Sequence, residues 1–280
     1  MSREIVKKLY LKSCFEELKI LKPGNHSIYS KIIGMNLEKF RRAAKISSDI
    51  LTDKNLSIGN AIFFSSRKCF IELGSNYNLG IVLLCAPIIK ISIEGIKNLR
   101  SDLKKEVASI KNEDGDLIFK AIDYVKPGGI GKYKGKGNVS SYKKSLNFRK
   151  VMKIGSKWDR ISRCYEENYS EILNFGLPYY RSIKLKKSEK VAAELLYLNY
   201  LSTDTDSHIQ RKFGREKALS AMRKSQMIQK QINLKKNYKR ILLKLDKYLK
   251  VYHYNPGTCA DLTVTTLLID KIIDIFRCPV

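Results

Sequence analysis

The stretch Asn255-Pro256-Gly257-Thr258-Cys259-Ala260-Asp261 runs directly into an apolar segment near the C-terminus. The apolar positions of that segment are Leu262, Val264, Leu267, Leu268, Ile272 and Ile275. They predict a helix, with Thr258 placed to cap its first amides and Asp261 placed to complement its dipole. Because proline and glycine let the backbone approach closely, the start of this helix can bind a phosphate group through its N–H groups.

Loops of the same chemistry recur at three other places. They are Lys22-Pro23-Gly24-Asn25, Asn76-Tyr77-Asn78-Leu79-Gly80 and Lys126-Pro127-Gly128-Gly129-Ile130-Gly131-Lys132. A single Pro-Gly turn is common between secondary-structure elements and by itself indicates no function. Several such loops, rich in lysine and asparagine, instead predict phosphate and ribose contacts gathered from distant parts of the chain. We therefore expect these loops to converge on one cleft that binds a polyphosphorylated nucleoside.

The composition indicates a globular protein with an extreme positive charge. Of 280 residues, 44% are hydrophobic, and 54 basic against 27 acidic residues give a formal charge of +27. The charge can attract RNA, attract a small phosphorylated ligand, or reflect a general bias towards lysine, isoleucine and asparagine. The lysines are spread along the chain, which disfavours a nucleic-acid partner.

The cysteines show no metal-binding or disulfide pattern. They are Cys14, Cys69, Cys85, Cys164, Cys259 and Cys278, without a Cys-x-x-Cys or zinc-type spacing. Free, buried, reduced thiols are expected, which fits a cytoplasmic protein. No apolar signal-like segment opens the chain, and the apolar run from residue 79 to 89 is shorter than the roughly 20 residues that span a bilayer. We expect no membrane association.

Apolar residues at three- and four-residue steps predict helices along most of the chain. The segments concerned are residues 11–21, 37–51, 58–73, 79 onward, 117–125, 158–173, 191–201, 215–233 and 238–252. Residues 88–93 are the only weak strand candidate, and the glycine- and lysine-rich residues 132–141 predict a mobile loop. The sequence therefore predicts an all-α fold, a single domain over residues 1–280 with about ten helices.

The segment from Thr203 to Gly214 concentrates ionisable side chains. It reads Thr203-Asp204-Thr205-Asp206-Ser207-His208-Ile209-Gln210-Arg211-Lys212-Phe213-Gly214. Asp206 can be an ordinary helix N-cap followed by a solvated turn. Alternatively, Asp206 and His208 lie beside a phosphate or sugar hydroxyl, with Arg211 and Lys212 as anion contacts.

Two further carboxylates allow more than one interpretation. Glu17 can bind magnesium or pair with Lys19 or Lys22, and Asp261 can be a capping residue, a magnesium ligand or a base. Magnesium takes one or two carboxylates plus substrate phosphates, so no dedicated metal motif is needed. The chain has no Walker loop, Rossmann turn, nucleophile elbow or zinc helix.

Taken in order, these motifs resemble the triphosphoribosyl-dephospho-CoA synthase family, which makes the prosthetic-group precursor of citrate lyase and malonate decarboxylase. The matching segments span almost the whole chain: Glu17 with Lys22-Pro23-Gly24-Asn25, Asn76-Tyr77-Asn78-Leu79-Gly80-Ile81 with Leu83-Leu84 and Pro87, Pro127-Gly128-Gly129-Ile130-Gly131, Asp206-Ser207-His208-Ile209 with Arg211-Lys212, and Asn255-Pro256-Gly257-Thr258-Cys259-Ala260-Asp261-Leu262.

The resemblance implies an all-helical enzyme that joins ATP to 3′-dephospho-CoA, releases adenine and leaves a triphosphoribosyl group on the ribose 2′-hydroxyl. It also implies Mg²⁺ with ATP as the donor. The new linkage is α whereas ATP is a β-nucleoside, so the simplest course is one inverting displacement. That course needs a base for the hydroxyl and an acid or hydrogen bond for the adenine.

By this resemblance, Asp261 or Asp206 is the base or a metal ligand, His208 is catalytic, and Glu17 is a further metal ligand. The residues expected to bind nucleotide and phosphate are Lys22, Gly24, Asn25, Asn76, Asn78, Gly80, Lys126, Gly128, Gly129, Gly131, Arg211, Lys212, Asn255, Gly257 and Thr258.

The chain also departs from the citrate lyase members. Leu56-Ser57-Ile58-Gly59 stands where they carry Thr-His-Lys-Gly, and Asn138-Val139 replaces an Asp-Val pair. The chain looks closer to a shorter branch associated with tetrahydromethanopterin-type one-carbon cofactors, so a related phosphoribosyl-type transfer is one alternative. The +27 charge and 16 tyrosines motivate another, a non-enzymatic helical RNA-binding protein.

Overall fold

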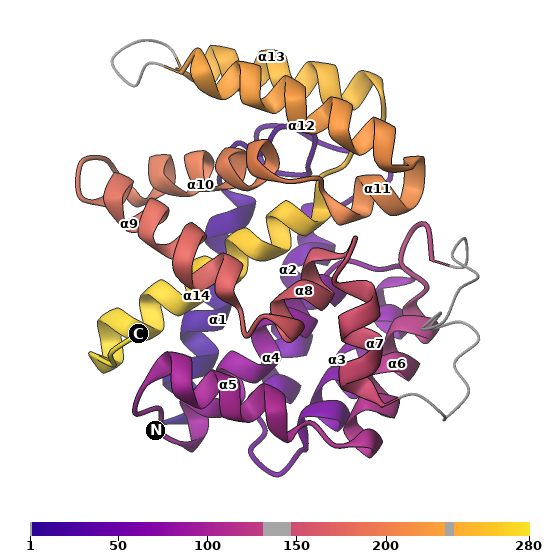
Figure 1. Cartoon of the computed structure of the whole chain (residues 1–280), viewed down its shortest axis with the longest axis vertical. Helices are drawn as coiled ribbons and strands as arrows, with labels where there is room; N and C mark the ends of the chain where they lie inside the picture. The colour runs from indigo at the N-terminus through magenta and orange to yellow at the C-terminus, as the bar shows by residue number, and fades with distance from the viewer. Residues whose placement is uncertain (1, 131–146, 233–237) are drawn as a thin grey trace.

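The computed structural model describes residues 2–130, 147–232 and 238–280 (Figure 1). Within these ranges the chain forms helices and turns and no strand. The first helices are α1 (Arg3–Leu18), α2 (Leu37–Leu51), α3 (Ile58–Leu73), α4 (Leu79–Glu94), α5 (Leu99–Ser109), α6 (Asn112–Val125) and α7 (Phe148–Gly155). The others are α8 (Arg160–Glu166), the π-helix η2 (Glu171–Gly176), α9 (Leu177–Lys184), α10 (Glu189–Thr203), α11 (Ser207–Phe213), α12 (Arg215–Lys230), α13 (Tyr238–Val251) and α14 (Gly257–Phe276). The all-α prediction is confirmed.

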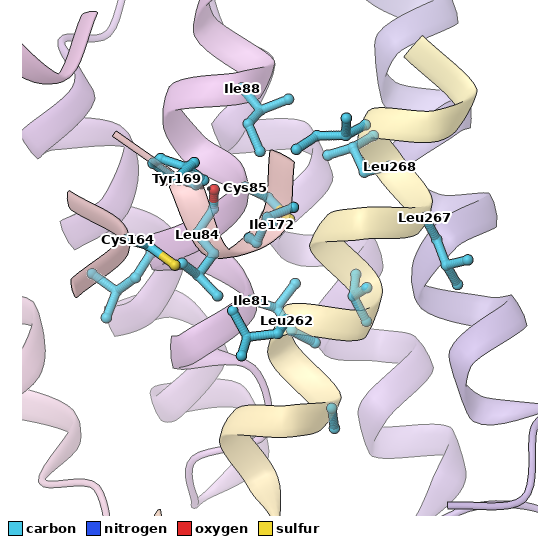
Figure 2. Close-up of a cluster of buried hydrophobic side chains, with 14 of the residues drawn as sticks. Ile81, Leu84, Cys85, Ile88, Cys164, Tyr169, Ile172, Leu262, Leu267 and Leu268 are labelled. Atoms are coloured by element: carbon cyan, nitrogen blue, oxygen red, sulfur yellow. Dashed lines mark hydrogen bonds between the residues drawn. The ribbon is translucent and has the colours of Figure 1, made fainter. Parts of the chain in front are cut away.

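Helices α4 and α14 form the centre of the molecule. Figure 1 shows α14, in yellow, crossing the middle of the fold beside α1. Ile81 of α4 lies near Leu262 of α14, and Ile88 lies near Leu268, so the two helices run in the same direction (Figure 2). Each fully buried aliphatic side chain contributes roughly 1.5–3 kcal/mol. This packing brings the N-termini of both helices to the same place.

Helices α2 and α3 have the predicted bounds, and the structure shows side-chain caps at their N-termini. Ser57 precedes α3, and its hydroxyl oxygen accepts a hydrogen bond from the amide of Asn60 at 3.3 Å. The helix ends at Gly74, whose φ of 75° is left-handed and therefore suits glycine. Asn36 caps α2 in the same way, accepting from the amide of Glu38 at 2.8 Å.

Helix α4 continues through Pro87, where the helical hydrogen bond to the Leu83 carbonyl is missing because proline has no N–H. The hydroxyl of Tyr165 in α8 donates to that carbonyl oxygen at 2.6 Å instead. Tyr169 donates to the neighbouring Leu84 carbonyl at 3.0 Å. The two tyrosines therefore satisfy buried backbone oxygens and attach the α8 region to α4.

Three details of the prediction were wrong. Thr258 does not cap α14, because the helix begins two residues earlier than a cap at Thr258 would require, with Pro256 at the N-cap position and no side-chain cap. Residues 88–93 are helical, since burial within α4 overrides the strand preference of β-branched residues. The predicted helix over residues 158–173 is interrupted at Asn168 and Tyr169, whose φ values are 49° and 62°. The sequence patterns also missed the shorter helices α5, α7 and α9. The predicted loop at residues 132–141 lies outside the described residues.

Among the described residues, no single helix is long and apolar enough to cross a bilayer. Only α4 and α5 taken together pass by length and composition, and they are bent by 113° to one another. All six cysteines are free and buried, as predicted. Burial raises the pKa of the Cys85 thiol to about 12.

Candidate active site

The predicted loops converge on one cavity of about 870 Å³, which we call the central cavity. Its wall is formed by the N-termini of α4 and α14, the C-terminal part of α1, α11 and the segment that follows α6. The residues of the predicted motifs that line it are Glu17, Asn25, Asn76, Asn78, Gly80, Gly128, Gly129, His208, Arg211, Lys212, Asn255, Gly257, Thr258 and Asp261. The expected convergence of distant loops is therefore confirmed.

The first and last motifs contact each other directly. The side-chain nitrogen Nδ2 of Asn25 donates a hydrogen bond to the side-chain oxygen Oδ1 of Asn255 at 2.7 Å. A Cβ on Gly24 would lie 2.6 Å from the Tyr254 carbonyl oxygen and 2.9 Å from Pro256 Cδ. Because no side chain fits there, and because the φ of Gly24 is +78°, only glycine lets the two loops pack together.

The imidazole of His208 lies between two glycine loops. A Cβ on Gly257 would be 2.7 Å from its Nδ1, and one on Gly128 would be 3.4 Å from its Nε2. Burial lowers the pKa of His208 below its ordinary value, an effect that Asp206 opposes and that Arg211 reinforces. His208 is therefore neutral near pH 7 and can donate or accept a hydrogen bond in the cavity.

Asp261 presents the carboxyl group with the most perturbed environment in the cavity. It packs against Gly80 at the start of α4, where its oxygens occupy the space that a Cβ would need. Among the described residues, no donor hydrogen-bonds to this carboxyl group. Burial raises its pKa well above the usual range, and the nearby Glu17 and Asp206 raise it further. An ionisable group of this kind in a cavity is typical of a catalytic or ligand-binding residue.

Glu17 and Lys22 form a buried ion pair beside Asp261. Burial raises the pKa of Glu17 and lowers that of Lys22, while their mutual attraction opposes both shifts. Glu17 lines the cavity, but Lys22 stands behind it. The pairing of Glu17 with Lys22 suggested by the sequence is thus present at the wall of the cavity.

Asp206 is a structural connection between α11 and α14. One carboxylate oxygen accepts from the amides of His208 and Ile209 at 2.9 and 3.0 Å. The other accepts from the amide of Cys259 at 2.9 Å. Both carboxylate oxygens are buried and accept hydrogen bonds. Asp206 is therefore the N-cap of α11, which was one of the two interpretations of the sequence.

Arg211 brings positive charge to the cavity and is held by Asp159. Its guanidinium pairs with the Asp159 carboxylate, while its buried Nε has no hydrogen-bond partner within the described residues. The Arg211 backbone passes close to Gly129, where a Cβ would lie 2.6 Å from the carbonyl oxygen. Lys212 is more exposed, and its ammonium lies 5.4 Å from the ring centre of Phe213. An unpaired guanidinium nitrogen suits an anionic ligand.

The two asparagines before α4 fix the shape of that loop. The side-chain oxygen of Asn76 accepts from the Leu79 amide at 3.1 Å. The side-chain nitrogen Nδ2 of Asn78 donates to the Ala43 carbonyl oxygen and to the Ser47 hydroxyl, both at 3.1 Å. They therefore hold the open end of α4 in place while still lining the cavity.

Four predicted site residues do not line the cavity: Lys22, Gly24, Lys126 and Asp206. Lys126 is exposed at the end of α6, whereas Lys22, Gly24 and Asp206 are buried behind the residues that line the cavity. Gly131 lies outside the described residues. Sequence reasoning missed Asp159 and a group of apolar lining residues from α6, α7 and α8. The one available signal was Trp158, the only tryptophan of the chain, directly before Asp159.

The fold and the cavity define an all-α protein whose cavity is large enough for a nucleotide and is built from glycine-bearing loops. A family model described as ATP:dephospho-CoA triphosphoribosyl transferase matches residues 3–278. The chain belongs to this family. It is also similar in fold to a crystal structure from Archaeoglobus fulgidus, whose assignment as a triphosphoribosyl-dephospho-CoA synthase is itself provisional. That comparison has a TM-score of 0.63 at 18% identity and covers 81% of this chain and 97% of the other. A search of curated proteins found no match.

Proposed function

We propose that the protein transfers the triphosphoribosyl group of ATP to the ribose 2′-hydroxyl of 3′-dephospho-CoA and releases adenine. The observation that supports this most directly is the convergence of the family's motifs on the central cavity, with the Asp261 carboxyl group at its polar end. Family membership supplies the class of reaction, and the cavity supplies residues with suitable chemistry for each step.

In this proposal the triphosphate binds at the helix N-termini and Arg211. In the first turns of α4 and α14 the amides of Leu79 and Cys259 are taken by Asn76 and Asp206. The amides of Gly80 and Thr258 have no partner among the described residues and are available to phosphate oxygens. The unpaired Nε of Arg211 adds a charged donor. Holding the triphosphate still fixes C1′ of the ribose at the far end of the donor.

The displacement then needs one proton acceptor and one proton donor. Asp261 takes the proton of the acceptor hydroxyl as its oxygen bonds to C1′ of the donor. The bond from C1′ to adenine N9 breaks with inversion, the neutral imidazole of His208 donates a hydrogen bond to the departing adenine, and solvent supplies the proton that adenine takes up. The raised pKa of Asp261 brings its basicity closer to neutral pH, where a general base is effective.

The carboxylate oxygens of Glu17 and Asp261 suit magnesium, which prefers oxygen ligands. The described residues contain no group of three acidic, histidine or cysteine side chains able to hold a metal. Glu17 and Asp261 are nevertheless neighbouring carboxylates that face the cavity, and Mg²⁺ takes one or two carboxylates plus substrate phosphates. Glu17 would be its main protein ligand. Bound there, the ion would neutralise the charge of the triphosphate.

The test is incubation of the purified protein with Mg·ATP and 3′-dephospho-CoA, followed by chromatography for adenine and mass analysis of the acceptor. We expect equal amounts of adenine and of an acceptor enlarged by one triphosphoribosyl group. Absence of adenine release from protein that binds ATP would eliminate this reaction. Mn²⁺ binding to Asp261→Asn separates the two roles of this carboxylate, because a base can be replaced without loss of metal affinity whereas a ligand cannot.

A second acceptor class follows from the Lys22-Pro23-Gly24-Asn25 and Asp206-Ser207-His208-Ile209 segments, which resemble the branch associated with pterin-type cofactors. Adenine release that depends on a pterin-cofactor precursor, and not on 3′-dephospho-CoA, would favour this alternative.

A further inference from the structure

One side of the central cavity is apolar and, apart from Leu83, belongs to none of the sequence motifs. We call it the apolar wall, and it consists of Leu83, Ile122, Val151, Met152, Trp158 and Ile161. These residues come from α4, α6, α7, α8 and the turn before α8. The helices α6 and α7, and α7 and α8, pack against each other (Figure 1).

The apolar wall begins beside the reacting atoms. Leu83 lies three residues after Gly80, and therefore about one helical turn from the glycine that contacts Asp261. The hydrogen bond from Tyr165 to the Leu83 carbonyl attaches α8 to α4 at this point. Phe148 packs edge-on against Tyr165, with ring centres 5.3 Å apart, and so connects α7 to the same structure. The wall is thus a supported surface that extends away from the proposed base.

The apolar wall cannot bind phosphate groups. Among the described cavity-lining residues from α6 to α8, Asp159 is the only charged one, and it is paired with Arg211. A phosphate group placed there would lose its hydration without a cation to replace it. The part of a substrate that lies on this wall must therefore be uncharged.

The position of the wall favours the acceptor over the donor. In the proposed reaction the donor's triphosphate and ribose lie near Arg211 and the N-termini of α4 and α14, and its adenine must remain near His208 to accept a hydrogen bond as it leaves. The acceptor hydroxyl must lie at Asp261, from which the wall leads along α4 and α8. A cavity of about 870 Å³ is at the upper end of the roughly 300–1,000 Å³ usual for one ligand, which suits two substrates.

We infer that the apolar wall binds an extended, uncharged arm of the acceptor, which for 3′-dephospho-CoA is the chain beyond its diphosphate. This inference rests on the proposed function. It makes the wall a determinant of acceptor choice that is independent of donor binding.

The experiment compares two acceptors that differ only in the arm, at saturating Mg·ATP. These are 3′-dephospho-CoA and ADP, which carries the same nucleoside and diphosphate without the arm. For Ile161→Asn and Ile122→Asn we expect the KM for 3′-dephospho-CoA to rise about tenfold, because a polar amide replaces an apolar contact. The KM for ATP and the kinetics with ADP should not change. Ile71→Asn, an exposed site in the groove between α2 and α3, is the control.

Equal losses with both acceptors would overturn the inference, since the wall would then only support the fold. A raised KM for ATP would also overturn it and would place the donor's adenine on the wall. If no acceptor releases adenine, the proposed function fails. Calorimetric binding of 3′-dephospho-CoA then decides: about tenfold weaker binding to Ile161→Asn would support the wall as an arm site, and unchanged binding would refute it.

Discussion

The carboxyl group of Asp261 packs directly against the α-carbon of Gly80, so that the first turns of α14 and α4 touch at this point. A methyl group at residue 80 would occupy the space of the carboxylate oxygens, and one of the two must move. The glycine in this loop is therefore required by the position of an acidic side chain 181 positions later in the chain.

Replacing Gly80→Ala should remove activity while sparing the fold. Alanine is favoured over glycine inside a helix by about 1 kcal/mol, which offsets part of the steric cost. We expect kcat/KM to fall by about 100-fold or more, because the base is displaced from the reacting atoms. The check is a double-mutant cycle with Asp261→Asn. Additive losses would show that Gly80 acts through something other than Asp261.

The two aspartates near the cavity should behave oppositely when each is changed to asparagine. Asp206 accepts three backbone hydrogen bonds, so Asp206→Asn places an N–H₂ group against an amide donor and should cost about 1–3 kcal/mol of unfolding free energy. Asp261 accepts none from the described residues, so Asp261→Asn should keep its melting temperature and lose turnover. Loss of folding in Asp261→Asn would instead indicate a structural role.

The hydroxyl of Tyr165 should contribute to stability by satisfying the carbonyl that Pro87 leaves unpaired. Tyr165→Phe leaves the Leu83 oxygen without its donor and should cost about 1–3 kcal/mol in denaturant unfolding. Pro87→Ala restores an N–H that can reach the same oxygen, so the cost of Tyr165→Phe should be smaller in that background. An identical cost in both backgrounds would contradict this account.

Activity should be lost on the acid side at a pH well above the ordinary range of an aspartate. Burial, Glu17 and the buried Asp206 raise the pKa of Asp261, and a base must be deprotonated to act. The acid limb of kcat/KM, which reports the free enzyme, should therefore lie above about pH 4, the usual aspartate value. A limb at or below that pH would show that another group controls the rate.

His26 should make the folded state sensitive to acid. Its Nδ1 accepts a hydrogen bond from the Ile32 amide at 2.9 Å, and burial lowers its pKa to about 4. Since the unfolded chain binds this proton near pH 6.5, stability is complete above that pH and declines as pH falls towards 4. We expect the melting temperature of the wild type to fall more between pH 7 and 5 than that of His26→Asn. Parallel curves for the two proteins would exclude His26.

The sequence predicted the helices and the convergence of loops because both depend on local, repeated signals. Helix α3 follows from its apolar spacing over residues 58–73 and from Gly74 directly after it. The loops share Pro-Gly or Asn-rich sequences, which can be recognised at each position in the chain. The sequence could not predict that Asp206 accepts backbone hydrogen bonds whereas Asp261 does not. This difference depends on which backbone amides of other helices reach each carboxylate.

The apolar wall was hidden for a related reason. Apolar residues at helical spacing look the same in sequence whether they face the core or a cavity. Val151 and Met152 are buried and could equally have filled the interior. Only the arrangement of α6, α7 and α8 around the cavity makes them part of its wall.

Trp158 belongs to this surface, and it is the only tryptophan of the chain. The intrinsic emission of the folded protein excited at the red edge therefore originates within the cavity itself. Titrating an acceptor into the unlabelled enzyme should shift or quench that emission even in the absence of a donor, which gives a direct optical record of occupancy without any turnover.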